Sequence, residues 1–207
     1  MTLPLGLRAY RWATEAGAPL VRAWLNRRVR QGREAHDRVG ERYGRPGAPR
    51  PEGSLVWLHS ASVGEGRLSA AMAESLRARI GEVSVLFTCQ TRTAADLFAE
   101  LATADASAQY APVDTGDAVG AFLDHWRPDL AVWVESELWP NLVVETARRA
   151  VPMALINARL STRAARAWAR TPQSARFVLY CFDWIGAIEA ETATQLSHLA
   201  DRPIAAL

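Results

Sequence analysis

Short apolar runs alternate with amphipathic stretches from residue 54 onward, and this rhythm constrains the fold most. The apolar runs with the length of strands are 55–59, 83–88, 109–111, 130–134, 153–156 and 184–188. Helical spacing of apolar residues fills the intervals 67–79, 93–102, 118–126, 138–150, 161–169 and 191–199. Such alternation predicts a parallel sheet with helices on both faces, joined by right-handed crossovers. We therefore predict an α/β, Rossmann-like domain over residues 54–207.

The chain ahead of this domain is strongly basic. Residues 1–50 hold eleven Arg and four acidic residues (net +7), whereas residues 51–207 hold thirteen Arg and eighteen acidic residues (net −5). Gly17 and Pro19 divide its apolar stretch into two short helices, and the Pro and Gly content of residues 44–53 predicts a linker. Interleaved Trp, Leu and Arg suit a helix lying on a membrane surface or one packed on the domain. We predict a basic amphipathic helical segment over residues 1–50.

Composition excludes several classes of protein. The net charge of +2 demands no nucleic-acid partner. Cys89 and Cys181 lie far apart and lack the spacing of metal ligands, which disfavours a disulfide framework and a zinc site. No uncharged apolar run is long enough to span a bilayer.

The stretch 55–66 passes from an apolar strand into small residues and one carboxylate, Glu65. A parallel sheet binds ligands at this carboxyl edge, where Ser62 and Gly64 let another molecule approach the backbone. A carboxylate would repel a phosphate, so we interpret Glu65 as an acid or base. The alternative is an ordinary turn in which Glu65 stabilises the helix N-terminus. The glycine fingerprints of dinucleotide and P-loop sites are missing, which disfavours a nucleotide-dependent oxidoreductase.

A second candidate site follows the fourth predicted strand, which ends at two acidic residues, Glu135 and Glu137. Carboxylates over a buried strand are costly unless they face a polar ligand or a cation. Trp139 lies close enough in sequence to stack on a sugar ring. The alternative is an acidic pair that caps the helix beginning near Pro140.

Hydroxyl groups are concentrated after the second predicted strand, in the loop 88–93. They can bind sugar or phosphate oxygens, or Thr91 or Thr93 can cap the next helix. Asp114 follows the third strand, and we expect it to cap the helix that comes next in the chain.

Asn157 and Arg159 follow the fifth predicted strand. Arg159 can therefore reach a phosphate or pair with Glu135 or Glu137. His59 lies on an apolar strand, where we expect a core histidine with its hydrogen bonds satisfied.

Four runs in this order resemble the 3-deoxy-D-manno-octulosonic acid (Kdo) transferases of lipopolysaccharide synthesis, and the resemblance spans residues 35–195. The runs are Gly40-Glu-Arg-Tyr-Gly44, Leu58-His-Ser-Ala-Ser-Val-Gly-Glu65, Glu135-Ser-Glu-Leu-Trp-Pro-Asn-Leu142 and Asn157-Ala-Arg-Leu-Ser161. The resemblance implies the amino-terminal half of a GT-B glycosyltransferase, in which two Rossmann-like domains face a cleft.

In such enzymes the amino-terminal domain handles the lipid A precursor and the carboxyl-terminal domain binds the donor, CMP-Kdo. The resemblance further implies an inverting transfer without a metal ion or other cofactor, at the cytoplasmic face of the inner membrane of a Gram-negative bacterium. By the same resemblance Glu65 is the general base, and Glu135 and Glu137 belong to the acidic motif. The candidate substrate contacts are Ser62, Gly64, Arg67, Thr88, Thr91, Arg92, Trp139, Asn157 and Arg159.

The chain also departs from this family. Members are much longer, and residues for the cytidine nucleotide have no counterpart here, so we expect the chain alone to be inactive and the donor-binding domain to be separate or missing. The loop 88–93 runs into Arg92-Thr93-Ala94 where a Thr-Gly is expected. The alternative function is a non-catalytic module that binds the acceptor or docks on a partner.

Overall fold

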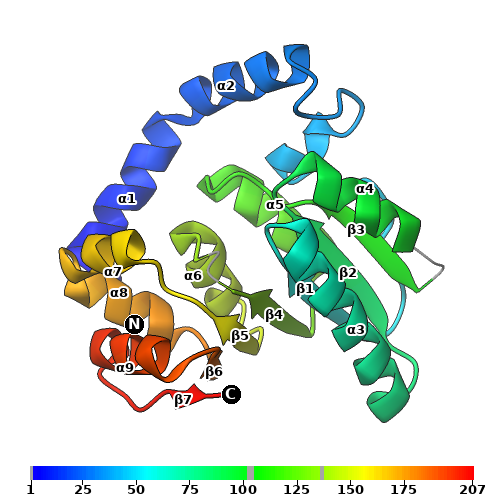
Figure 1. The fold of residues 1–207 in the computed structure, drawn as a ribbon. Coiled ribbons are helices and arrows are strands. Elements are labelled where there is room, and N and C mark those ends of the chain that lie inside the picture. Colours follow the sequence, from blue (N-terminus) through cyan, green and yellow to red (C-terminus); the bar gives the residue numbers. More distant parts are fainter. Residues whose placement is uncertain (1, 102–104, 136–137) are drawn as a thin grey trace.

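The computed structural model describes residues 2–101, 105–135 and 138–207. Within them one parallel sheet has the strand order β3-β2-β1-β4-β5-β6-β7 (Figure 1). The strands are β1 (Leu55–His59), β2 (Ser84–Cys89), β3 (Ala106–Tyr110), β4 (Leu130–Val134), β5 (Met153–Ala158), β6 (Trp184–Ala187) and β7 (Ala205–Ala206). This is the order of a Rossmann sheet extended by one short strand.

Helices cover both faces of the sheet, because successive strand residues point to opposite sides and nearly all of them are apolar. Trp57 and Trp133 belong to one core cluster, which is closed by α5, α6, α8 and α9. Val56 and Phe87 belong to the other, under α3 and α4. The helices of the sheet domain are α3 (Val63–Ile80), α4 (Arg92–Leu101), α5 (Gly116–Trp126), α6 (Pro140–Arg148), α7 (Thr162–Ala169), α8 (Pro172–Tyr180) and α9 (Ala190–Ala200). The predicted fold class is confirmed.

Among the differences from the sequence-based expectation, two concern helices of the sheet domain. Helix α8 is an addition: Pro172 opens it, and Ser174, Ala175 and Val178 are buried at helical spacing. Helix α3 begins at Val63, four residues earlier than we expected, so Glu65 lies in its first turn instead of in the preceding loop.

The basic segment forms two helices, as expected: α1 (Leu5–Ala16) and α2 (Ala18–Arg30), with Pro19 at the start of α2. Helix α1 is attached to the domain by buried Leu7 and by an ion pair of 2.8 Å between Arg11 and Glu145. The two helices form an arch that leads from α8 to the β2–β3 side of the sheet (Figure 1). Among the described residues, no helix has the length and apolar character needed to cross a membrane.

The chain after the arch is bound tightly to the sheet. Arg42, in a 3₁₀ helix (η1, Val39–Tyr43), is buried; its guanidinium bonds Glu34 at 3.2 Å and the carbonyl of Gln90 at 2.6 Å. Glu41 accepts a hydrogen bond of 2.6 Å from the backbone N–H of Tyr110. Gly44 has φ +75° and lies so close to Ala118 that no Cβ fits. The boundary that we expected near Ser54 therefore does not mark where packing on the sheet begins.

Candidate active site at the carboxyl edge of the sheet

The strand order reverses between β1 and β4, and the loops after these two strands lie next to each other. Ligands of open α/β sheets bind in the crevice at such a switch point. Glu65 follows β1 and Glu135 follows β4, so the topology brings two of the predicted acidic residues to this point. The sequence prediction of a site at this edge rested on the same two residues.

Glu65 turns back onto the loop that precedes its helix. One carboxylate oxygen accepts the backbone N–H of Ala61 at 2.6 Å, and the other accepts the hydroxyl of Ser62 at 2.8 Å. Ser62 is the N-cap of α3, but its hydroxyl donates to Glu65 and caps no backbone N–H, so Glu65 itself fastens the loop to the first turn of the helix. The carboxylate is thereby fixed in orientation. Glu65 therefore stabilises the start of α3, as the alternative interpretation of the sequence proposed, and this role does not exclude a catalytic one.

Glu135, directly after β4, and Asn157, the second-last residue of β5, lie in the left-handed region, with φ of +66° and +52°. Non-glycine residues seldom adopt this conformation, and such strain is concentrated at functional sites. The Nε of Arg159 lies 3.6 Å from a carboxylate oxygen of Glu135, so of the alternatives that the sequence left open for Arg159 the structure contains the pairing with Glu135. Glu137 lies outside the described residues.

The surroundings of Glu135 favour its protonated form. Partial burial and the negative charge of Glu65 raise the pKa of Glu135 above its ordinary value, while Arg159 opposes this shift. Two carboxyl groups that influence each other at one strand edge are typical of acid–base sites. No group of three His, Cys, Asp or Glu side chains suited to a metal ion occurs in the described part of the chain.

Asp114 caps a different helix from the one expected. Its carboxylate accepts the backbone N–H groups of Asn141 (3.1 Å) and Leu142 (2.8 Å), at the start of α6, and the hydroxyl of Tyr10 (2.9 Å). Thr115 holds the N-cap position of α5 instead. Our expectation failed because sequence adjacency favours α5, whereas the fold places the N-terminus of α6 against the loop that carries Asp114.

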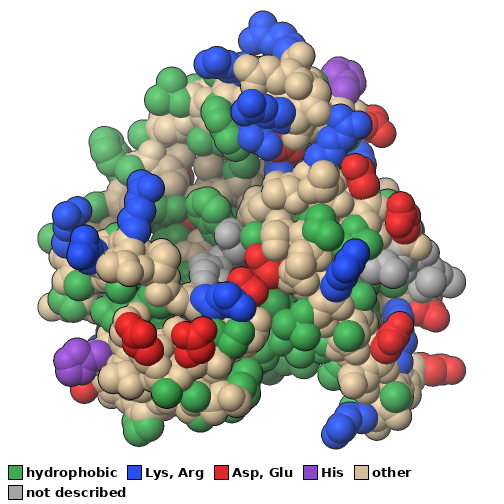
Figure 2. All heavy atoms as spheres, viewed as in Figure 1, with side chains coloured by type: hydrophobic (Ala, Val, Ile, Leu, Met, Phe, Trp, Pro, Cys, Tyr) green, Lys and Arg blue, Asp and Glu red, His purple; other side chains and the backbone are tan. Residues whose placement is uncertain are grey.

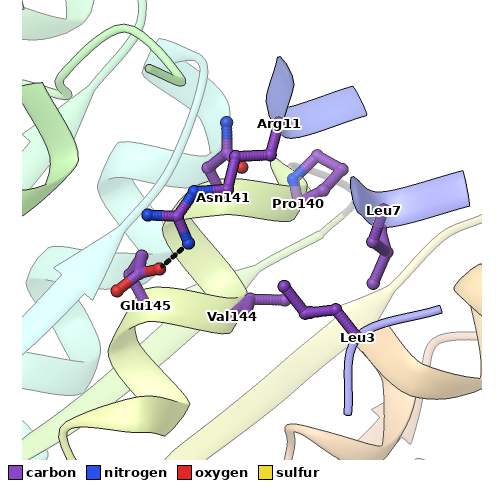
Figure 3. A pocket seen from close by; sticks show the side chains of 7 residues that line it. All are labelled: Leu3, Leu7, Arg11, Pro140, Asn141, Val144 and Glu145. Atoms are coloured by element: carbon purple, nitrogen blue, oxygen red, sulfur yellow. Dashed lines mark hydrogen bonds and ion pairs between the residues drawn. The ribbon is translucent and has the colours of Figure 1, made fainter. Parts of the chain in front are cut away.

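The junction of α1 and α6 is closely packed (Figure 3). Arg11 reaches Glu145 across it, and Leu3 and Leu7 lie against Val144. The space left between them is about 10 Å³, enough for one water molecule. This junction therefore attaches α1 to the domain and offers no room for a substrate.

A larger groove of about 700 Å³ lies under the arch, between the two amino-terminal helices and the loops at the carboxyl edge. Figure 2 shows the hollow, with apolar and Arg side chains interspersed along the arch that borders it. Apolar residues from both walls line it: Leu20, Val21, Trp24, Pro112, Val113 and Trp139. Leu20, Trp24 and Trp139 are 76%, 53% and 40% exposed, so the groove presents apolar surface to solvent.

The predicted substrate contacts fall into separate groups. Trp139 and Thr91 line the groove, and Thr91 also caps α4 through the N–H of Ala94. Arg92 is exposed but donates to the carbonyl of Gly32 at 2.8 Å. Thr88 is fully buried, and its hydroxyl bonds Trp57 and His59 at 2.8 Å, so we remove Thr88 from the substrate contacts.

Three further predicted contacts lie at the start of α3. Gly64 and Arg67 are exposed in the first turns of α3, and Ser62 is engaged with Glu65. Sequence reasoning missed Leu20 and Trp24 as groove residues. The available signal was their spacing, one helical turn apart on a stretch otherwise rich in Arg.

A Rossmann sheet with two interacting carboxyl groups at its switch point and a groove beside it has the architecture of one half of a GT-B fold. Solved structures agree on the fold: UDP-GlcNAc 2-epimerase from Neisseria meningitidis has a TM-score of 0.51 at 16% identity, covering 74% of this chain and 46% of that one. A 2-epimerase from Listeria monocytogenes described as putative gives the same TM-score at 13% identity, covering 74% and 44%.

Residues 37–206 match the family described as 3-deoxy-D-manno-octulosonic-acid transferase (kdotransferase), and the chain belongs to this glycosyltransferase family. A probable mitochondrial Kdo transferase from Arabidopsis thaliana is 35% identical over 161 residues, which are 78% of this chain and 36% of the relative. The Kdo transferase of Bordetella pertussis is 31% identical over 198 residues, 93% and 46% respectively. The chain therefore spans less than half the length of these relatives.

Proposed function

We propose that this chain is the acceptor-binding half of an inverting glycosyltransferase that moves Kdo from CMP-Kdo to a lipid A precursor. The observation that carries the proposal is the placement of Glu65 and Glu135 at the sheet's switch point, beside a groove with an apolar lining. Membership of the Kdo transferase family supports the choice of donor and acceptor.

Glu65 is the proposed general base. Ala61 and Ser62 each occupy one acceptor position on a different carboxylate oxygen, and a carboxylate has about four such positions. An acceptor hydroxyl can therefore bind Glu65 without breaking either of these hydrogen bonds. As its oxygen bonds to the anomeric carbon of Kdo, the proton passes to Glu65 and the bond to CMP breaks. The fixed orientation of the carboxylate lowers the cost of aligning it with the hydroxyl.

Glu135 and Arg159 form the supporting pair in this proposal. Arg159 is half exposed beside Glu135, so its guanidinium also faces solvent at the site. It is suited to hold a phosphate of the acceptor or the departing CMP next to the reacting centre. No step of the proposed transfer requires a metal ion or another cofactor.

The groove is suited to the apolar part of a glycolipid acceptor. Leu20 and Trp24 from the arch face Pro112, Val113 and Trp139 from the sheet edge across the cavity. Helix α2 carries four Arg and no acidic residue, which favours contact with anionic headgroups. We therefore propose that the protein acts at the cytoplasmic face of an inner membrane. The donor-binding domain would be a further part of the same polypeptide or a separate polypeptide.

One observation favours a second function. Each oxygen of Glu65 already accepts a hydrogen bond that stabilises the helix start, and this contact would be kept in a protein without catalysis. The chain would then be an acceptor-binding or partner-docking module. Both functions use the same groove, and they differ only in turnover.

The deciding experiment measures Kdo transfer from CMP-Kdo to a lipid A precursor, first by this chain alone and then mixed with a separately expressed carboxyl-terminal half. We expect transfer only in the mixture. Glu65→Gln should abolish it, whereas Glu74→Gln, an exposed glutamate further along α3, should not. Binding of the precursor without turnover in either sample would establish the binding module and refute the role of Glu65 as base.

A further inference from the structure

A row of buried side chains crosses the sheet one step below the candidate site. Gln109, Thr88, His59 and Trp133 are register partners on the neighbouring strands β3, β2, β1 and β4. Partners in a parallel sheet point to the same face, so these four side chains lie side by side. All are at most 1% exposed. The loops that carry Glu65 and Glu135 leave the sheet directly above the last two of them.

The tryptophans packed into this face differ in how their indole N–H groups are satisfied. Trp57 donates to the hydroxyl of Thr88, and Trp126 donates to the side-chain carbonyl of Gln109, both at 2.8 Å. The N–H of Trp133 finds no partner among the described residues, and neither does Nε2 of the adjacent His59. Their rings meet edge to face, with centroids 5.8 Å apart. Buried polar atoms are rarely left unpaired, because an unmet donor is costly.

The hydrogen bonds of Thr88 decide which nitrogen of His59 carries the proton. The Thr88 hydroxyl oxygen accepts the Trp57 N–H, and its own hydrogen needs an acceptor in the apolar core. Nδ1 of His59, at 2.8 Å, is that acceptor. The neutral ring then carries its proton on Nε2. His59 and Trp133, whose ring centroids are 5.8 Å apart, therefore each carry a buried N–H donor that requires an oxygen.

We propose that His59 and Trp133 together bind one buried water, whose oxygen accepts both N–H groups and joins the carboxyl ends of β1 and β4. A water suits this place better than an anion because no described cation is hydrogen-bonded to either nitrogen, and burial of an unpaired charge is expensive. Glu135 follows Trp133 by two residues, and the loop to Glu65 begins directly after His59. His59 and Trp133 are thus positioning residues that set the separation of the two carboxyl groups. This positioning role rests on the proposed function, whereas the water site does not.

The first test compares the stabilities of Trp133→Phe, Trp126→Phe and Trp57→Phe in the purified chain. Each variant loses the same ring volume and one buried indole N–H. If a water accepts the Trp133 N–H, Trp133→Phe should reduce the folding equilibrium constant about as strongly as the two controls. If that N–H is unpaired, its removal relieves the desolvation cost of a buried donor. The folding equilibrium constant of Trp133→Phe should then be about tenfold or more larger than those of the two controls. That result would overturn the proposal.

A second measurement uses the wild-type chain and needs no variant to fold. Imidazole ¹⁵N NMR should find His59 neutral with its proton on Nε2, and a high-resolution crystal structure should place a water within hydrogen-bonding distance of both nitrogens. A proton on Nδ1, or a dry contact between the rings, would refute the water site.

The positioning role has its own readout, the pKa of Glu135 measured by carboxyl ¹³C NMR. Trp133→Phe should move this pKa toward its ordinary value, because the carboxyl groups separate, while Trp126→Phe should leave it unchanged. An equal shift of the Glu135 pKa in both variants would show that Trp133 only packs in the core and does not position Glu135. None of these measurements depends on Kdo transfer, so failure of the proposed function would leave the water site standing.

Discussion

Arg159 and Glu135 meet across neighbouring strand ends, with 3.6 Å between the guanidinium Nε and a carboxylate oxygen. Glu135 leaves β4 and Arg159 follows β5, and the backbone between them includes Asn157 in the left-handed region. The pair therefore depends on two strained strand ends. Arg159 also offsets the negative charges of Glu65 and Glu135, which otherwise repel each other.

Replacing Arg159 with Gln should raise the pKa of Glu135 further, because the opposing positive charge is lost while burial and the charge of Glu65 remain. Carboxyl ¹³C NMR titration measures this directly. Arg163→Gln is the matched control, since Arg163 is exposed on the neighbouring helix α7. A lower pKa in Arg159→Gln would contradict the pairing.

The buried pair of Glu34 and Arg42 should dominate the attachment of the arch to the sheet. Their side chains are 1% and 4% exposed, so Glu34→Gln leaves a buried guanidinium short of its counter-charge. We expect a loss of about 3–5 kcal/mol in the free energy of unfolding, measured by urea denaturation. Glu15→Gln, which breaks the exposed pair with Arg11, should cost less than about 1 kcal/mol. Equal losses would show that burial does not determine how much each ion pair contributes to the free energy of unfolding.

Much of this architecture could be predicted from the sequence because most residues of its central strands are apolar. Leu55–His59 and Leu130–Val134 have the predicted bounds, since such runs between turns suit only a buried strand. The edge occupied by Glu65, Glu135 and Arg159 followed from the same strand ends. What could not be predicted are contacts between segments far apart in the chain. Asp114 shows this best, because its partners lie at least 27 residues away.

Burial of individual polar residues was also beyond sequence reasoning. Thr88 ends the predicted strand 83–88 and also begins a run of hydroxyl residues, so the sequence left open whether its side chain faces the core or, like that of exposed Thr91, the solvent. The difference arises because Thr88 is still within β2, with its side chain on the face packed against Trp57. Likewise, the motif residue Asn141 donates to Thr14 and to the carbonyl of Asp114, contacts that only the folded arch creates.

The role of Asp114 can be tested through the helix that it caps. Asp114→Ala should weaken protection of the Asn141 and Leu142 amides against hydrogen exchange, because their acceptor is lost. The cost should be about 1–2 kcal/mol. Tyr10→Phe serves as control, since it removes a third partner of Asp114 and leaves both amides bonded. Loss of amide protection at the start of α5 instead would show that Asp114 caps α5, as its position in the sequence suggested.

His59 should make the protein sensitive to acid. Burial, with the charge of Arg42 adding to it, lowers the pKa of His59 from 6.5 to about 3. Between these values the unfolded chain binds a proton that the folded chain does not, so stability decreases as the pH falls through this window. The slope from this residue is about 1.4 kcal/mol per pH unit. Urea unfolding from pH 4 to 7 should show a flatter dependence for His59→Gln, whereas exposed His198→Gln should retain the wild-type slope.

The last prediction concerns the groove and distinguishes specific binding of the acceptor from non-specific binding to a membrane. Leu20 lines the groove and is 76% exposed, so Leu20→Asp should leave folding intact while placing a charge in the apolar lining. Affinity for a lipid A precursor, measured by titration of tryptophan fluorescence, should fall about tenfold or more, since burying an apolar side chain of this size is worth about 1.5–3 kcal/mol.

Trp12→Asp is the matched control for this prediction. Trp12 is 72% exposed on α1 and is not among the residues that line the groove. If the groove holds the acceptor, this variant should bind the precursor normally, although both variants should bind anionic vesicles less well because each adds a negative charge to the arch. Equal loss of precursor binding in the two variants would mean that the outer surface of the arch, and not the groove, contacts the lipid. The groove would then have no part in recognising the acceptor.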